Sequence, residues 1–167
     1  TGFATTDFDQ WPEFSRTLLV MLMFIGACAG STGGGIKVSR ILMYMKTIKK
    51  ELGILIHPRS VKIVMMDGKK LDHPVVRAAN IFLISYAGIL VASILLLTID
   101  NFDFTTNVTA VISALNNIGP GLSLVGPAGN FAFFSGFSKY VLMFDMLAGR
   151  LEIFPMLLLF VPYTWKK

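Results

Sequence analysis

Residues 104–121 read FTTNVTAVISALNNIGPG, an apolar stretch that is too short to cross a membrane and runs into a glycine-containing loop. As a helix, the apolar part at 104–115 would reach only about half way through a bilayer core of ~30 Å. Residues 116–121 then interrupt it with the sequence NNIGPG. Irregular backbone at membrane depth is tolerated only where it is buried in protein or lines a water-filled cavity. The stretch therefore predicts a half-membrane helix that ends in a buried loop.

Such a helix, entered from outside, favours a cation at its inner end. Its carbonyl end points to the membrane centre, where the helix dipole is negative. Carbonyls of Asn117, Ile118 and Gly119 can replace the water around a dehydrated ion, and glycine permits the φ angles that aim them inward. A span, a half-helix, a glycine loop and a second span make up the plan of a potassium-channel pore unit. The alternative is an ordinary outside loop with one buried helical turn.

Composition places the whole chain in the membrane class. Of its 167 residues, 54% are apolar and 15% are charged, with a mean hydropathy of +0.66, whereas soluble domains carry about 25% charged residues. Residues 75–98 hold Arg77 as their only charge and would reach ~36 Å as a helix, enough to cross the bilayer core. Residues 138–161 are equally long. We expect an all-α membrane protein, with lipid as its surroundings.

The charges predict the orientation of these segments. Ten of the fifteen basic residues lie between Lys37 and Arg77, in a block that joins two hydrophobic segments. The positive-inside rule assigns that block, and the terminal Lys166 and Lys167, to the cytoplasm. The same placement argues against nucleic acid as the partner of a chain with net charge +5. The outside is predicted for the acidic residues Asp7, Asp9, Glu13, Asp100 and Asp103.

A run of glycines interrupts the first apolar segment, residues 17–45. The run GSTGGG occupies 30–35 and resembles a phosphate-binding loop, but Ile36 stands where that motif needs lysine. Close helix packing is another use of glycine in membranes. Four glycines are too many for packing alone, since each costs ~1 kcal/mol against alanine inside a helix. A helix broken at mid-membrane depth is the better account, and broken helices belong to transport pathways.

The last span carries three charges, Asp145, Arg150 and Glu152. Charged side chains at this depth are expected to face the protein interior or water. At 100° per residue Asp145 and Glu152 share a face, while Arg150 points away from both. Arg150 is 12 residues past Ser138 and Gly30 is 14 past Arg16, so the arginine and the glycine loop should lie at similar depth. A pore would suit Arg150, and a structural ion pair with another helix is the alternative.

The middle of the chain is predicted to be a cytoplasmic link. His57-Pro58 ends the preceding helix, and residues 61–71 form a small hairpin that turns at Asp67-Gly68. The chain thus divides into 1–52, 53–74 and 75–167, the last holding a span (75–98), a half-helix (104–115), a filter loop (116–121) and a span (138–161). No metal-spaced cluster or paired nucleophile and base is evident. A membrane-embedded enzyme and a non-conducting assembly subunit remain the alternatives to a conductor.

Several motifs, taken together and in order, resemble one family. The sequence is similar to the membrane subunit of the Trk-type potassium uptake systems, in a superfamily with the Ktr and the plant and fungal transporters. The resemblance covers almost the whole chain and rests on TGF at 1–3, FIGACAGSTGGGIK at 24–37, HPR at 57–59, NNIGPG at 116–121 and GRLE at 149–152.

The resemblance implies four channel-like repeats of span, pore helix, filter and span around one pore. This chain would be a fragment that starts in the third filter and holds all of the fourth repeat. Filter residues binding potassium would be Thr1, Gly2, Asn117, Ile118 and Gly119. The gate beneath the filter would be Gly30, Ser31, Thr32, Gly33, Gly34 and Gly35, with Arg150 facing the pore beside it.

The resemblance also implies what surrounds the chain. It implies a cytoplasmic (inner) membrane location with a cytoplasmic C-terminus, a homodimer, and a cytosolic nucleotide-binding regulatory subunit. Potassium would be the transported ion, without an organic cofactor on this chain. The basic hairpin would suit docking of that subunit, although a solvated positive-inside link is the better explanation of its charge. Asp145 departs from the neutral residue expected in this family.

Overall fold

Helices are the main elements of the part of the chain that the structure describes. The computed structural model describes residues 2–28, 30–31, 33–59, 63–66 and 68–150. The expected all-α class is confirmed, and the strands are only two residues long. The elements in chain order are η1 (Phe8–Gln10), α1 (Glu13–Phe24), α2 (Val38–Ile56), β1 (Met65–Met66), β2 (Lys69–Lys70), α3 (His73–Leu97), η2 (Thr98–Asp100), α4 (Phe104–Asn116), η3 (Ser123–Val125) and α5 (Gly136–Arg150).

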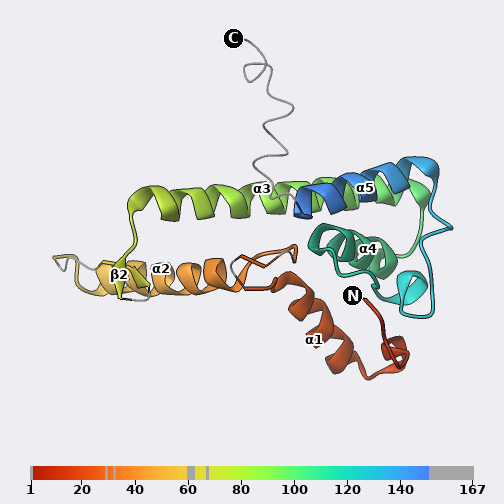
Figure 1. The fold of residues 1–167 in the computed structure, drawn as a ribbon, viewed down its shortest axis with the longest axis horizontal. Coiled ribbons are helices and arrows are strands. Elements are labelled where there is room, and N and C mark those ends of the chain that lie inside the picture. Colours follow the sequence, from red (N-terminus) through yellow and green to blue (C-terminus); the bar gives the residue numbers. More distant parts are fainter. Residues whose placement is uncertain (1, 29, 32, 60–62, 67, 151–167) are drawn as a thin grey trace, which may run out of the picture.

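Short α4 lies at the centre of this arrangement. It packs against α5, α3 and α1, while α2 extends away from it toward the hairpin (Figure 1). Every residue from Thr109 to Asn116 is buried, including the polar Thr109, Ser113 and Asn116. A helix buried on all sides must be enclosed by other elements. The half-helix predicted at 104–115 is thus an interior element, bounded as Phe104–Asn116.

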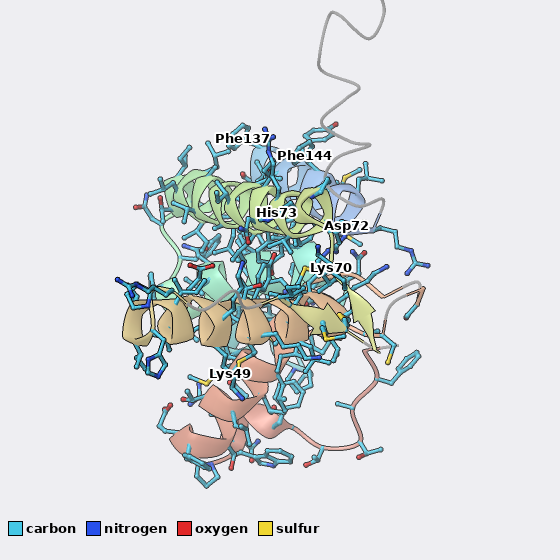
Figure 2. All side chains as sticks on the ribbon, turned by 90° about the vertical axis from the view of Figure 1, so that its left-hand side faces the viewer. Lys49, Lys70, Asp72, His73, Phe137 and Phe144 are labelled. Carbon is cyan, nitrogen blue, oxygen red and sulfur yellow. The ribbon has the colours of Figure 1, made fainter. Side chains whose placement is uncertain are left out.

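Two acidic side chains stabilise one end of the molecule, where α4 begins and where η3 lies. The Asp103 carboxylate caps α4 by accepting the Thr106 amide at 3.0 Å, and the Thr106 hydroxyl also donates to it. These bonds, the hydroxyl first, hold the pKa of Asp103 below its ordinary value. Asp9 accepts the backbone amide of Ser123 at 3.1 Å, which ties the start of the chain to η3. The hairpin lies at the opposite end (Figure 1), and Figure 2 looks onto that end, with Lys49, Lys70 and His73.

α3 is the described helix that meets the requirements of a membrane span. His73–Asp100, which includes η2, has 28 residues, and within the described part of the chain it is the one helix long and apolar enough to cross. The prediction was 75–98. For the last span, predicted at 138–161, the helix begins at Gly136 and is described to Arg150, so residues 151–161 lie outside the described part.

The first apolar segment is broken over a longer stretch than 30–35. α1 ends at Phe24 and α2 starts at Val38, so the non-helical stretch is 25–37. Its two ends pair with each other: the amide of Gly26 donates to the carbonyl of Ile36 at 2.8 Å, and that of Val38 to Ala27 at 3.3 Å. Because of this pairing, the apolar residues on both sides of the glycines do not belong to α1 or α2. We call residues 26–37 the glycine loop.

The link between α2 and α3 contains a hairpin. Met65 pairs with Lys70 and Met66 with Lys69, leaving a two-residue connection at 67–68. Gly68 has a φ of 76°, the conformation that such tight turns require of glycine. The Lys46 ammonium donates to the carbonyl of Met65 at 2.8 Å and fastens the hairpin to α2.

Candidate functional site

The end of α4 organises the loop that follows it. Asn117 takes a left-handed conformation, with φ of 54° and ψ of 46°. Its amide donates to Ala114, and that of Ile118 to the carbonyl of Ser113 at 3.0 Å. The Gly119 amide donates to the Ser113 hydroxyl at 3.1 Å. Since all three amides are bound to α4, the oxygens of this stretch are the groups it can offer to a ligand.

The first residues of the chain lie against this stretch. A Cβ atom on Gly2 would be 2.8 Å from the carbonyl oxygen of Ile118, and one on Gly119 would be 3.4 Å from the Cα of Gly2. Both glycines have positive φ, 77° for Gly2 and 117° for Gly119. Two predicted filter segments, distant in sequence, are therefore neighbours. Thr1 lies outside the described residues.

The glycine loop touches the base of the same stretch. A Cβ atom on Gly34 would be 2.8 Å from the Asn116 carbonyl oxygen. On Gly35, whose φ is 80°, it would be 2.6 Å from the Asn116 side-chain oxygen. Only glycine permits this approach without displacing the end of α4.

A cavity of about 440 Å³ connects the two predicted parts of the site. Its wall includes Gly2 and Ile118 from the filter segments, Gly33 and Gly34 from the glycine loop, and Asn116 between them. The apolar end of α1, with Leu19, Leu22 and Met23, and Ile25 just after it complete the wall.

The tip of the glycine loop is held by its own short bonds. Ser31 donates its amide to the Cys28 carbonyl at 3.1 Å, and its hydroxyl accepts the Gly33 amide at 3.1 Å. Gly30 has a φ of 83°, and among the described residues no atom outside its neighbours lies within 4 Å of where its Cβ would be. The tip thus stands away from the rest of the chain at Gly30. Thr32 lies outside the described residues.

Arg150 is close to the glycine loop, as counting along the two spans predicted. It ends the described part of α5 and lines a small cavity of about 30 Å³ with Ser31, Gly33 and Gly35. Lys37, the last residue of the loop, and Arg40 of α2 line the same cavity. Three basic side chains thus surround the base of the loop. Arg150 itself is exposed on the surface of this chain.

Asp145 is buried away from that cavity. Its side chain has no exposure and accepts a hydrogen bond from the Ser93 hydroxyl of α3 at 2.7 Å. Its second carboxylate oxygen has no hydrogen-bond partner among the described residues. Glu152, expected on the same face, lies outside the described residues.

Two contacts at the end of α4 were not predicted from the sequence. The Tyr86 hydroxyl of α3 donates to the side-chain oxygen of Asn116 at 2.9 Å. Gly149 of α5 lies directly on α4, where a Cβ atom would be 1.8 Å from the Leu115 carbonyl oxygen. The sequence did offer a signal for the first contact, because Tyr86 is a polar residue inside an apolar span. Gly149 carries no comparable signal, because glycines are common in membrane helices.

The chain matches known proteins over its whole length. The family described as "TrkH: Cation transport protein" matches residues 1–167. The Trk system potassium uptake protein TrkH of Salmonella typhimurium is 40% identical over 166 residues, which are 99% of this chain and 34% of the relative. The protein of that name from Vibrio parahaemolyticus is 44% identical over 165 residues, with the same shares.

A solved structure has the same fold. The crystal structure of the potassium transporter TrkH from Vibrio parahaemolyticus matches with a TM-score of 0.88 and 44% identity, over 99% of this chain and 35% of that one. The chain therefore spans about a third of the length of the proteins it matches.

Proposed function

Because this chain belongs to the TrkH family of cation transport proteins, we propose that it forms part of a potassium-conducting pore. In this proposal Thr1 and Gly2 belong to one strand of a selectivity filter, and Asn117, Ile118 and Gly119 to the next. Backbone oxygens of these strands take the place of water around the potassium ion. Potassium is the cargo, and its passage needs no organic cofactor on this chain.

One observation carries the proposal: Gly2 lies against Ile118 and Gly119 at the end of the buried half-helix α4. A filter needs several strands at one level. The backbone carbonyl oxygens of each strand must not be hydrogen-bonded to the helix that precedes it. Asn117, Ile118 and Gly119 bond to α4 through their amides, which supports the second requirement. The carbonyl end of α4 adds a dipole that favours a cation at this level.

The gate in this proposal is the glycine loop with Arg150. The loop contacts Asn116 directly below the filter strand, and Gly33 and Gly34 line the cavity an ion would enter. Arg150 lies on the other side of the loop, where its guanidinium repels cations and can donate to loop oxygens.

The surroundings of the pore follow from the family and the charge pattern. We propose an inner-membrane location in which the hairpin and the C-terminus face the cytoplasm, since the basic residues cluster at the hairpin end. A homodimer and a cytosolic nucleotide-binding subunit are the proposed partners, with lipid around the spans. The relatives are named as potassium uptake proteins, which favours transport over an enzymatic role.

Deleting residues 31–34 from the full-length protein tests the proposal. The deletion removes the obstruction below the filter, so rubidium uptake into vesicles should rise severalfold over wild type. Thermal stability of the same preparation serves as the control. A stable protein with uptake no higher than wild type would argue against the gate. A fall in both stability and uptake would show that the loop is a packing hinge.

A further inference from the structure

Tyr86 controls the orientation of the side chain on which the glycine loop lies. Tyr86 and Asn116 are both buried, with exposures of 4% and 5%. The tyrosine hydroxyl donates to the Asn116 side-chain oxygen at 2.9 Å, and the Asn116 nitrogen donates to the Ile112 carbonyl at 2.9 Å. A donor at one end of the carboxamide and an acceptor at the other fix which way it points.

The oxygen that Tyr86 holds is the one that faces Gly35. The loop approaches it so closely that a Cβ atom on Gly35 would be 2.6 Å away. Gly34 lies equally close to the Asn116 backbone. The contact surface of the loop therefore includes a side chain whose position depends on one tyrosine hydroxyl.

Tyr86 also connects to the helix that follows the loop. Its ring stacks on Phe82, one turn earlier in α3, with centroids 6.2 Å apart. The Arg40 guanidinium lies 4.0 Å above the Phe82 ring. Arg40 is in the first turn of α2, immediately after the loop. Phe24, just before the loop, and Ile36, near its end, pack against the cluster that contains Tyr86.

We propose that Tyr86 is a positioning residue that keeps the glycine loop against the end of α4 and so lowers resting conduction. This rests on the proposed gate. The filter residues have separate anchors: Asn117 and Ile118 bond through their amides to α4, and the Asn117 side chain donates to the Met146 carbonyl at 3.1 Å. Tyr86 therefore affects how often the path is open and leaves the preference between ions unchanged.

Tyr86→Phe in the full-length protein tests this, because it removes the hydroxyl and keeps the stacked ring. Loss of one buried hydrogen bond shifts an equilibrium by roughly threefold to tenfold. We expect rubidium uptake into vesicles to rise by that factor, with an unchanged rubidium-to-sodium ratio. Tyr44→Phe is the matched control, since the Tyr44 hydroxyl also joins two helices, α2 and α3, but bonds to the Ala79 carbonyl instead of Asn116. Its uptake should stay within about twofold of wild type.

Combining Tyr86→Phe with the 31–34 deletion separates the two proposals. If Tyr86 acts through the loop, its substitution should add nothing once the loop is gone. If the deletion raises uptake and Tyr86→Phe does not, the role of Tyr86 is wrong and the gate stands. If the deletion itself fails to raise uptake in a stable protein, the gate is wrong.

Two further outcomes overturn the positioning role. A changed ion ratio in Tyr86→Phe would show that Tyr86 acts on the filter. An equal rise in Tyr44→Phe would show that any lost contact between helices has this effect. Should Tyr86→Phe give little protein, Asn116→Ser removes the same bond from its other partner, and no rise in uptake there would equally contradict the proposal.

Discussion

Gly149 and Arg150 are adjacent in α5 but act in different ways. Gly149 touches the backbone of α4, where a Cβ atom would be 1.8 Å from the Leu115 carbonyl oxygen. Arg150 faces the cavity beside the glycine loop. The first residue sets how closely two helices approach, and the second sets the charge near the proposed pathway. Their substitutions should therefore affect different measurements.

Gly149→Ala should lower stability. The added methyl group cannot fit against a backbone oxygen, so α5 must move away from α4, at a cost of about 1–3 kcal/mol. Thermal unfolding of the full-length protein in detergent measures this. Gly88→Ala in α3 is the matched control, since no atom of the described residues lies within 4 Å of its Cβ position and alanine favours helix by up to ~1 kcal/mol. A Gly149→Ala protein as stable as the control would contradict the packing shown here.

Arg150→Ala should raise cation uptake severalfold without changing which ion is preferred. The substitution removes a positive charge from the proposed pathway and the hydrogen bonds that a guanidinium can give to the loop. The alternative is a structural ion pair, whose loss would leave a partner charge buried at a cost of ~3–5 kcal/mol. Rubidium uptake and thermal stability of one preparation distinguish these. A drop in both would show that Arg150 holds helices together.

At the scale of elements, the sequence predicted the helices that depend on length and composition. The half-helix was expected at 104–115 and is Phe104–Asn116, because Asp103 caps its start and Asn117 turns the chain at its end. α3 was expected at 75–98 and is His73–Leu97. Both are set by apolar residues and by local turn chemistry, which a sequence shows directly.

The broken helix was only partly predictable. The glycines at 30–35 located the break, but the break extends over 25–37. Ile25 and Ile36 would suit a helix, and they leave it because they pair with each other across the loop. That pairing is a tertiary contact between residues that local sequence describes as helical.

The site, like the broken helix, was only partly predictable from the sequence. Counting along two spans predicted that Arg150 and the glycine loop lie at one depth, and they line one cavity. The bond from Tyr86 to Asn116 joins residues 30 apart on separate helices, so no local pattern contains it. The functional roles of the filter and loop residues stay predictions.

At the scale of the whole molecule, the proposed pore would take two neighbouring filter strands from this chain. Gly2 and the 117–119 stretch stand side by side, while the proteins it matches are about three times as long. A ring of oxygens around an ion requires strands from the rest of such a protein. Ion preference is therefore a property of the assembled molecule, and its measurement requires the full-length chain.

The most direct test of the filter is the rubidium-to-sodium uptake ratio of the full-length protein with Gly119→Ser. Gly119 has a φ of 117°, where a side chain costs about 1–3 kcal/mol in strain, so the oxygens of this strand should be displaced. Gly88→Ser, in open space on α3, controls for the added hydroxyl. The proposed filter predicts a ratio that falls by roughly tenfold in Gly119→Ser and is unchanged in the control. An unchanged ratio in a normally expressed Gly119→Ser protein would contradict it.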